Sequence, residues 1–295
     1  MIRTSAQRVQ RVANWSHVWI PLAIIFTATA AMKTGPQTEL VSIPVGDATL
    51  SAKLYRPAGR GPFPAILINH GSGRTAEQLK QLGPYEQQAE TLGPVFARHG
   101  YLCLFLFRRG VGPSTETGVN AVDLMNAEFV AHGQAARNQL QLQLLEGREQ
   151  RDAAAALIYL RGRPDVDSNR LGLVGHSFGG SLTLLLAEHD SHLRALVLFS
   201  TAGYSWNNSP ELRARLIASL PHIQAPVFFI HAANDYSINP GTVMDATLAQ
   251  LGRRHRLKIY PPIGVTPDDG HDFPLSGVKI WEPEVFAFLR ETMRK

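Results

Sequence analysis

The sequence predicts an α/β fold, in which a doubly wound, mostly parallel sheet is covered by helices on both faces. Two apolar runs, FPAILIN at 63–69 and YLCLFLF at 101–107, are typical of strands buried on both sides. Helix-like segments separate such runs along the chain. Strand–helix alternation of this kind indicates right-handed crossovers between parallel strands.

The individual elements follow from local patterns. Residues 38–47 and 48–57 alternate apolar and polar residues and predict two strands, joined by a turn near Gly46. In 149–161, apolar residues recur at i, i+3, i+4 and i+7, which predicts one buried helix face. The further strands are expected at 63–69, 101–107, 170–177, 193–200, 225–232 and 256–263. The further helices are expected at 84–99, 178–189, 211–220, 240–251 and 282–294.

The segment 113–150 is less regular, and it is longer than an ordinary connection. Apolar residues at helical spacing, among them Leu140, Leu144 and Leu145, predict helical pieces rather than disorder. Because the segment follows the end of the strand 101–107, it is expected on the same side as the other strand ends. Two interpretations stay open: a small helical cap over a binding pocket, or a surface helix packed beside the sheet.

The strand at 170–177 ends in Gly175-His176-Ser177-Phe178-Gly179, the G-x-S-x-G pattern of a nucleophile elbow. On such a strand-to-helix turn a serine hydroxyl projects outward, and side chains at the glycine positions would collide with the adjoining strand and helix. Ligands of open α/β sheets bind at the carboxyl ends of strands, where this serine lies. Ser177 is therefore the predicted nucleophile; the alternative is a structural turn.

A serine nucleophile needs an imidazole base and a carboxylate that orients it. On this kind of fold the acid and then the base follow the serine in the chain. Asp235 comes directly after the strand 225–232, and His271 lies in the loop after the last strand. His231 lies inside a strand end, too early for a flexible loop. Asp235 and His271 are therefore the predicted partners of Ser177.

The carbonyl oxygen of a substrate also needs hydrogen-bond donors once it becomes negatively charged. The N–H of Phe178, at the start of the helix after the elbow, is one predicted donor. The N–H of Ser72, in the loop after the strand 63–69, is the other. No Walker loop or G-x-G-x-x-G pattern is present, and His189 and His192 lack a third ligand at metal-site spacing. No cofactor and no metal are expected.

The composition argues against nucleic-acid binding despite a net charge of +5. Three of the 29 basic residues and none of the 24 acidic residues fall in 1–30, so the remainder is close to neutral. The single cysteine, Cys103, excludes an intrachain disulfide and is expected in the core. Without linkers or repeats, 31–295 is interpreted as one catalytic domain.

Residues 1–30 have the layout of a secretory signal peptide. A basic start precedes an apolar run at 18–32, which at about 15 residues is short for a bilayer span. The run ends in small residues, with Ala28-Thr29-Ala30 fitting a cleavage site. The expected location is outside the cytoplasm, periplasmic or secreted. The alternative is an uncleaved N-terminal anchor, which would be the chain's one membrane contact.

These motifs together resemble the dienelactone hydrolase-like branch of the α/β-hydrolase superfamily. The matching stretches lie between about 40 and 290 and are LYRPAGRGPFPAILINHGSG, FRRGVGPST, LRGRPDVDSNRLGLVGHSFGG, HAANDYS and DDGHDFP. They are also similar to the catalytic domains of prolyl oligopeptidases. The resemblance implies an eight-stranded α/β-hydrolase sheet whose second strand is antiparallel, an acyl-enzyme and no cofactor. It matches Ser177, Asp235 and His271 to the family's triad, and FRRGVGPST to a supporting turn.

Dienelactone hydrolases proper use a cysteine nucleophile, whereas this chain has Ser177, a departure that favours an ordinary carboxylic ester as substrate. The sequence therefore predicts an exported serine hydrolase that acts on a small-molecule ester. Two alternatives remain: a serine peptidase of the prolyl oligopeptidase type, and a hydrolase fold that only binds its ligand. The intact serine, aspartate and histidine set argues against the second.

The leader should be removed near Ala30 when the protein is exported, because the basic start, short apolar run and small-residue motif all converge there. Intact-mass spectrometry of protein recovered from outside the cytoplasm checks this. Recovery of a chain that still carries Arg3 would favour the anchor.

Overall fold

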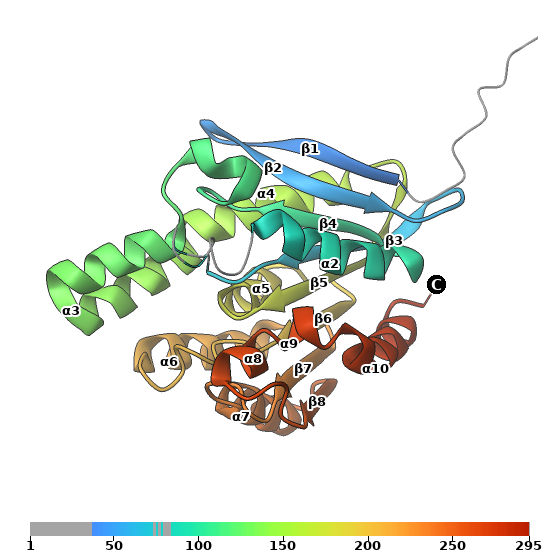
Figure 1. Ribbon diagram of the computed structural model, residues 1–295. Helices are drawn as coiled ribbons and strands as arrows, with labels where there is room; N and C mark the ends of the chain where they lie inside the picture. The colour runs from blue at the N-terminus through green and yellow to red at the C-terminus, as the bar shows by residue number, and fades with distance from the viewer. Residues whose placement is uncertain (1–36, 73–74, 76–77, 79–83, 295) are drawn as a thin grey trace, which may run out of the picture. The chain divides into compact units, whose positions relative to one another are not determined.

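The computed structural model describes residues 37–72, 75, 78 and 84–294 (Figure 1). Eight strands form a single sheet in the order β1-β2-β4-β3-β5-β6-β7-β8. Their bounds are β1 Gln37–Val45, β2 Ala48–Arg56, β3 Phe63–Asn69, β4 Leu102–Phe107, β5 Val166–His176, β6 Ala195–Phe199, β7 Val227–Ala232 and β8 His255–Tyr260.

The strand directions agree with the predicted topology. β2 runs antiparallel to both of its neighbours, β1 and β4, and every later pairing is parallel. The fold is therefore the α/β-hydrolase fold, as the sequence predicts. All residues of β4, β6 and β7 are buried, which explains their uninterrupted apolar sequences.

Helices cover both faces of the sheet. They are α2 Tyr85–Arg98, α3 Ala121–Glu146, α4 Arg148–Arg161, α5 Phe178–Ala187, α6 Pro210–Ser219, α7 Asn239–Gln250, α8 Pro267–His271, α9 Phe273–Ser276 and α10 Val278–Thr292, with short 3-10 helices at Gly112–Thr117 and Leu220–His222. Helices α3 to α7 pack into one apolar cluster. Helices α2, α9 and α10 pack into a second cluster on the opposite face, which includes the buried Cys103.

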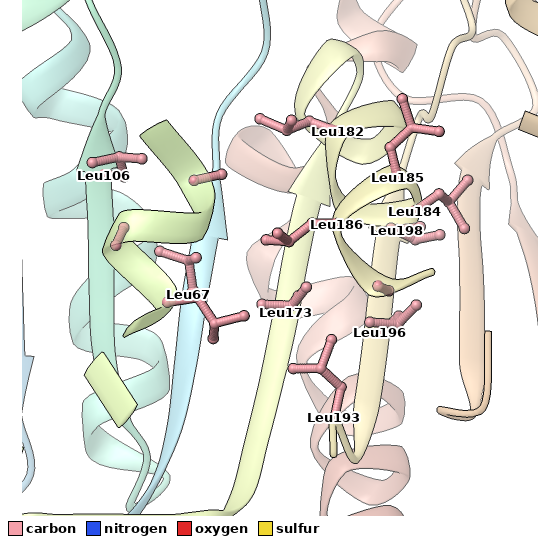
Figure 2. Close-up of a cluster of buried hydrophobic side chains, with 14 of the residues drawn as sticks. Leu67, Leu106, Leu173, Leu182, Leu184, Leu185, Leu186, Leu193, Leu196 and Leu198 are labelled. Atoms are coloured by element: carbon pink, nitrogen blue, oxygen red, sulfur yellow. The ribbon is translucent and has the colours of Figure 1, made fainter. Parts of the chain in front are cut away.

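Helix α5 is buried along its whole length, and this fixes the position of its first residue. Figure 2 shows leucines of α5 facing leucines of β3, β5 and β6. Leu182, Leu184 and Leu185 are fully buried. Burial of each such side chain contributes about 1.5–3 kcal/mol relative to exposure. The elbow that precedes α5 is therefore attached to a helix that is buried throughout.

The segment 113–150 is mainly α3, which begins after the N-cap residue Asn120. Gly133 has φ +83° and divides α3 into two helical parts. Buried residues lie near both ends of α3, Ala121 and Met125 before the glycine and Leu144 and Leu145 after it, whereas Phe129 between them is 48% exposed. Figure 1 shows α3 reaching beyond the neighbouring helices. The segment is therefore anchored in the core at both ends, with a projecting stretch between them.

The predicted leader, 1–30, lies outside the described residues, so its cleavage and the location of the protein stay predictions. Within the part of the chain that the structure describes, no helix is long and apolar enough to cross a membrane.

Candidate active site

Ser177 occupies a sharp turn between β5 and α5. Its backbone has φ +55° and ψ −118°, a conformation that non-glycine residues rarely adopt. Its N–H donates to the carbonyl of Phe199 at 2.9 Å, which ties the turn to the neighbouring strand β6. The side chain is half-buried and faces a pocket. The strained turn thus presents a hydroxyl at the carboxyl end of the sheet.

The flanking glycines are required by the close packing of the turn. A Cβ on Gly175 would lie 2.5 Å from the carbonyl oxygen of Gly179. A Cβ on Gly179 would lie 2.1 Å from the carbonyl oxygen of Asn69 and 2.2 Å from that of His70. All three distances are too short for a Cβ atom. Glycine is therefore required at both positions for the steric reason that the elbow pattern predicts.

The three residues predicted to act together lie in a hydrogen-bonded chain. Ser177 Oγ is 2.8 Å from His271 Nε2, and His271 Nδ1 is 2.7 Å from Asp235 Oδ1. Asp235 lies in the turn after β7, and His271 lies after β8. His271 is in the short helix α8 rather than in the expected loop, and Thr266 with Asp269 forms the capping box of that helix.

The backbone of His271 is anchored by two further side chains. His176 Nε2 and Ser200 Oγ each donate a hydrogen bond to the carbonyl oxygen of His271 at 2.9 Å. Burial, reinforced by the neighbouring His271, lowers the pKa of His176 to about 4, so His176 is neutral near neutral pH. This role of His176 could not be predicted from the sequence, because His176 occupies a variable position of the elbow pattern.

A second histidine contacts the carboxylate. His231 Nδ1 is 2.8 Å from Asp235 Oδ2, and the His231 side chain is fully buried. His231, which the sequence disfavours as the base, thus bonds to Asp235 rather than to Ser177. Burial opposes ionisation of Asp235, but hydrogen bonds from His231 and His271 outweigh it and lower the pKa of Asp235 to about 2.

The loop after β3 lies beside the elbow, and a buried arginine holds it. Arg108 donates from Nη1 to the carbonyl of His70 at 2.8 Å and from Nη2 to the carbonyl of Gly71. Its Nε pairs with Glu149 of α4 at 2.7 Å, and both side chains are 1% exposed. The turn after β4 therefore supports this loop, as the sequence resemblance implied.

Arg108 also fixes the direction of the Ser72 N–H. In a planar trans peptide, the Gly71 carbonyl and the Ser72 N–H point in opposite directions, so a bond to the first orients the second. His70 assists, because its Nδ1 lies 2.8 Å from the same carbonyl. Burial and the adjacent Arg108 charge lower the pKa of His70 well below its usual range, so this imidazole is neutral. Neither Ser72 N–H nor Phe178 N–H donates to another described residue.

A pocket of about 270 Å³ opens onto Ser177 and His271. Residues of α3 form one wall, namely Val122, Met125, Asn126, Arg137 and Gln141. Tyr204 and Tyr236 also line the pocket, with their rings 5.1 Å apart and edge to face. The guanidinium of Arg137 lies over the Tyr204 ring at 5.9 Å. Phe129, on the same helix as Met125, is not among the lining residues.

Within the described residues, no group of three or more His, Cys, Asp or Glu side chains has the arrangement of a metal site. The arrangement around Ser177 can accept and return a proton through His271, and it leaves two backbone N–H groups beside the hydroxyl. These are the groups that nucleophilic catalysis by a serine requires.

The dienelactone hydrolase family matches residues 51–271. The chain belongs to this family. It is 25% identical, over 230 residues, to a protein of Methylorubrum extorquens provisionally named a carboxymethylenebutenolidase; the match covers 76% of this chain and 70% of that one. It is 30% identical to the quorum-quenching protein AidA of Acinetobacter baumannii over 163 residues, which cover 55% of this chain and 43% of AidA.

Among solved structures, the dienelactone hydrolase of Anabaena variabilis superimposes with a TM-score of 0.57 at 20% identity. The superposition covers 88% of this chain and 99% of that one, so this member of the dienelactone hydrolase family shares the fold nearly end to end. Membership supports a hydrolase with a small-molecule substrate.

Gly179→Ala should lower stability by roughly 1–3 kcal/mol and reduce hydrolase activity, because the added methyl must displace the backbone at Asn69 and His70. Gly71→Ala is the matched control: its Cβ would meet His176 Nδ1 at 3.6 Å and Ser177 Cβ at 3.8 Å, which are ordinary contacts. Melting temperatures of the two variants check this. Equal melting temperatures for both would contradict the steric argument.

Proposed function

We propose that the protein is a serine hydrolase that cleaves carboxylic esters through an acyl-enzyme. The observation that carries the proposal is the continuous chain from Ser177 Oγ through His271 to the ionised Asp235, open to a pocket. Carboxymethylenebutenolide, named in the Methylorubrum relative, is a lactone, and a lactone is a cyclic ester. This supports an ester as the substrate class.

In the proposed reaction, Ser177 Oγ attacks the ester carbonyl while His271 Nε2 takes the hydroxyl proton. Asp235 keeps the other ring nitrogen protonated and stabilises the imidazolium. The tetrahedral intermediate collapses when His271 returns the proton to the departing alcohol, which leaves an ester bond on Ser177. Water, activated by the same imidazole, then releases the acid and restores the serine.

The negative oxygen of each tetrahedral intermediate is assigned to the N–H groups of Ser72 and Phe178. Phe178 lies at the N-terminus of α5, where the helix dipole favours negative charge. The Ser72 peptide is oriented by Arg108 through the Gly71 carbonyl. Two fixed donors of this kind typically contribute several kcal/mol to the transition state.

The segment 113–150 is proposed to act as the cap that shapes the acyl pocket. Its residues line the pocket from both sides of Gly133, with Met125 before it and Gln141 after it. Gln141 also donates to Ser205 Oγ at 3.0 Å, which attaches this wall to the loop after β6. Export through the 1–30 leader belongs to the same proposal.

Ser177→Ala should reduce ester hydrolysis by roughly a thousandfold or more, because the attacking atom is lost. The melting temperature should change little, since the half-buried hydroxyl fills no core space. A screen of esters with graded acyl length, together with labelling by a fluorophosphonate, measures both activity and serine reactivity. An unlabelled wild-type protein would favour the binding alternative, and undiminished turnover by the variant would exclude this mechanism.

Activity should fall as the pH is lowered and His271 becomes protonated, because only the neutral imidazole can accept the Ser177 proton. Asp235 and His176 titrate at about 2 and about 4, so neither contributes near neutral pH. The pH profile of kcat/KM should therefore show one acid limb. His271→Gln should be as inactive as Ser177→Ala. A profile that is flat from mildly acidic to neutral pH would contradict the role of His271.

Met125→Ala should shift the preference toward longer acyl chains, because Met125 lines the pocket. Met125 is 1% exposed, so stability should also fall, by about 2–5 kcal/mol. Phe129→Ala is the control on the same helix and should leave the preference unchanged. Relative kcat/KM across acyl lengths, measured while both variants are folded, checks this. An unchanged acyl-length preference in Met125→Ala would indicate that α3 is a purely structural helix.

A further inference from the structure

His231 contacts the hydrogen-bonded chain of Ser177, His271 and Asp235 at the Asp235 carboxylate and not at Ser177. It is the penultimate residue of β7 and is fully buried. Its Nδ1–H donates to Asp235 Oδ2 at 2.8 Å, while Oδ1 of the same carboxylate accepts from His271 Nδ1 at 2.7 Å. Among the described residues, these two imidazoles are the only hydrogen-bond donors to the Asp235 carboxylate.

The surroundings of His231 do not otherwise call for a histidine. Its ring lies against α7 at Gly241, where a Cβ would come within 2.7 Å of His231 Nε2. That nitrogen is buried and has no hydrogen-bond partner among the described residues, which is unfavourable. A leucine would occupy similar space without an unpaired nitrogen. The one property that a leucine lacks is the Nδ1–H donor that reaches Asp235.

We propose that His231 is a positioning residue that holds the Asp235 carboxylate in the orientation His271 needs and shares its negative charge. The inference rests on the proposed serine hydrolase function. A carboxylate rotates about its Cβ–Cγ bond, and one hydrogen bond on each oxygen restrains that rotation. Because His231 draws part of the charge toward Oδ2, it also moderates how strongly Asp235 stabilises protonated His271.

Without the donor, two effects are expected. The carboxylate keeps one hydrogen bond instead of two, so its orientation becomes less defined and turnover falls. The charge that remains is shared with fewer donors, so protonated His271 is stabilised more and its titration moves upward. A residue that only filled space would produce neither effect.

The other titratable groups around this cluster stay unchanged in the experiment. They are His176 at the end of β5, Tyr236 after β7, Asp268 and Asp272 at α8, and the mutually bonded Asp245 of α7 and His255 of β8. A shift seen on substitution of His231 therefore reports the loss of its own hydrogen bond.

The test compares His231→Leu with His231→Asn. The two side chains have nearly the same shape, but the asparagine amide can place an N–H where Nδ1–H was. His231→Leu should lower kcat by roughly 10- to 100-fold with little change in KM, the loss expected for one hydrogen bond to a buried charge. The acid limb, and the NMR titration of the labelled His271 ring, should move to higher pH. His231→Asn should keep values close to wild type.

His255→Leu is the matched control: His255 lies on β8, the neighbour of β7, and its Nδ1 bonds to Asp245 of α7 rather than to Asp235. It should behave as wild type. If His231→Leu does not fold, His231→Gln replaces it, since the glutamine amide reaches the position of Nε2 rather than Nδ1 and should show the same losses.

Two results would overturn the inference: a folded His231→Leu or His231→Gln with wild-type kcat and wild-type His271 titration, or a folded His231→Asn as impaired as His231→Leu. The NMR titration follows His271 directly and needs no turnover. If Ser177→Ala kept full activity, the proposed serine hydrolase mechanism would be wrong. The NMR titration of His271 in the His231 variants would still test the role of His231.

Discussion

The first turn of α5 packs directly on the backbone at the ends of β3 and β5, and the geometry of the site depends on these contacts. Gly179 allows the approach to β3 and Gly175 the approach to β5, since a Cβ at either position would come within 2.5 Å of a carbonyl oxygen. The contact with β3 sets Ser177 and the loop at 70–72 side by side. Because α5 is buried on all sides, the leucine packing in Figure 2 maintains that spacing.

The buried charged side chains on the two sides of Ser177 have different roles. On the oxyanion side, the buried pair Arg108 and Glu149 spans from β4 to α4 and holds backbone carbonyls. Removing two charges from water is costly, so such a pair specifies a geometry more than it adds stability. On the base side, the buried charge of Asp235 is stabilised by hydrogen bonds from two imidazoles, one on each carboxylate oxygen.

The sequence predicted the strand and helix order because apolar periodicity is a local signal, and it predicted Ser177, Asp235 and His271 because strand ends locate them. It did not predict the contacts of His231, His176 or Arg108. Each of these depends on which distant backbone or carboxylate comes near in space, and His231 follows the ordinary pattern of a buried strand. The loop expected around His271 instead contains α8 and α9, since helices of four or five residues leave no periodicity to detect.

The position of α3 in the chain has a consequence for how selectivity and chemistry are encoded. One pocket wall comes from a single segment between β4 and α4, whereas Ser177, Asp235 and His271 follow later strands. Both ends of α3 are anchored in the core, by Ala121 and Met125 before Gly133 and by Leu144 and Leu145 after it. Because Met125 belongs to both the core and the pocket wall, the shape of this wall is coupled to the stability of the fold, while the hydrogen-bonded chain at Ser177 is encoded elsewhere in the sequence.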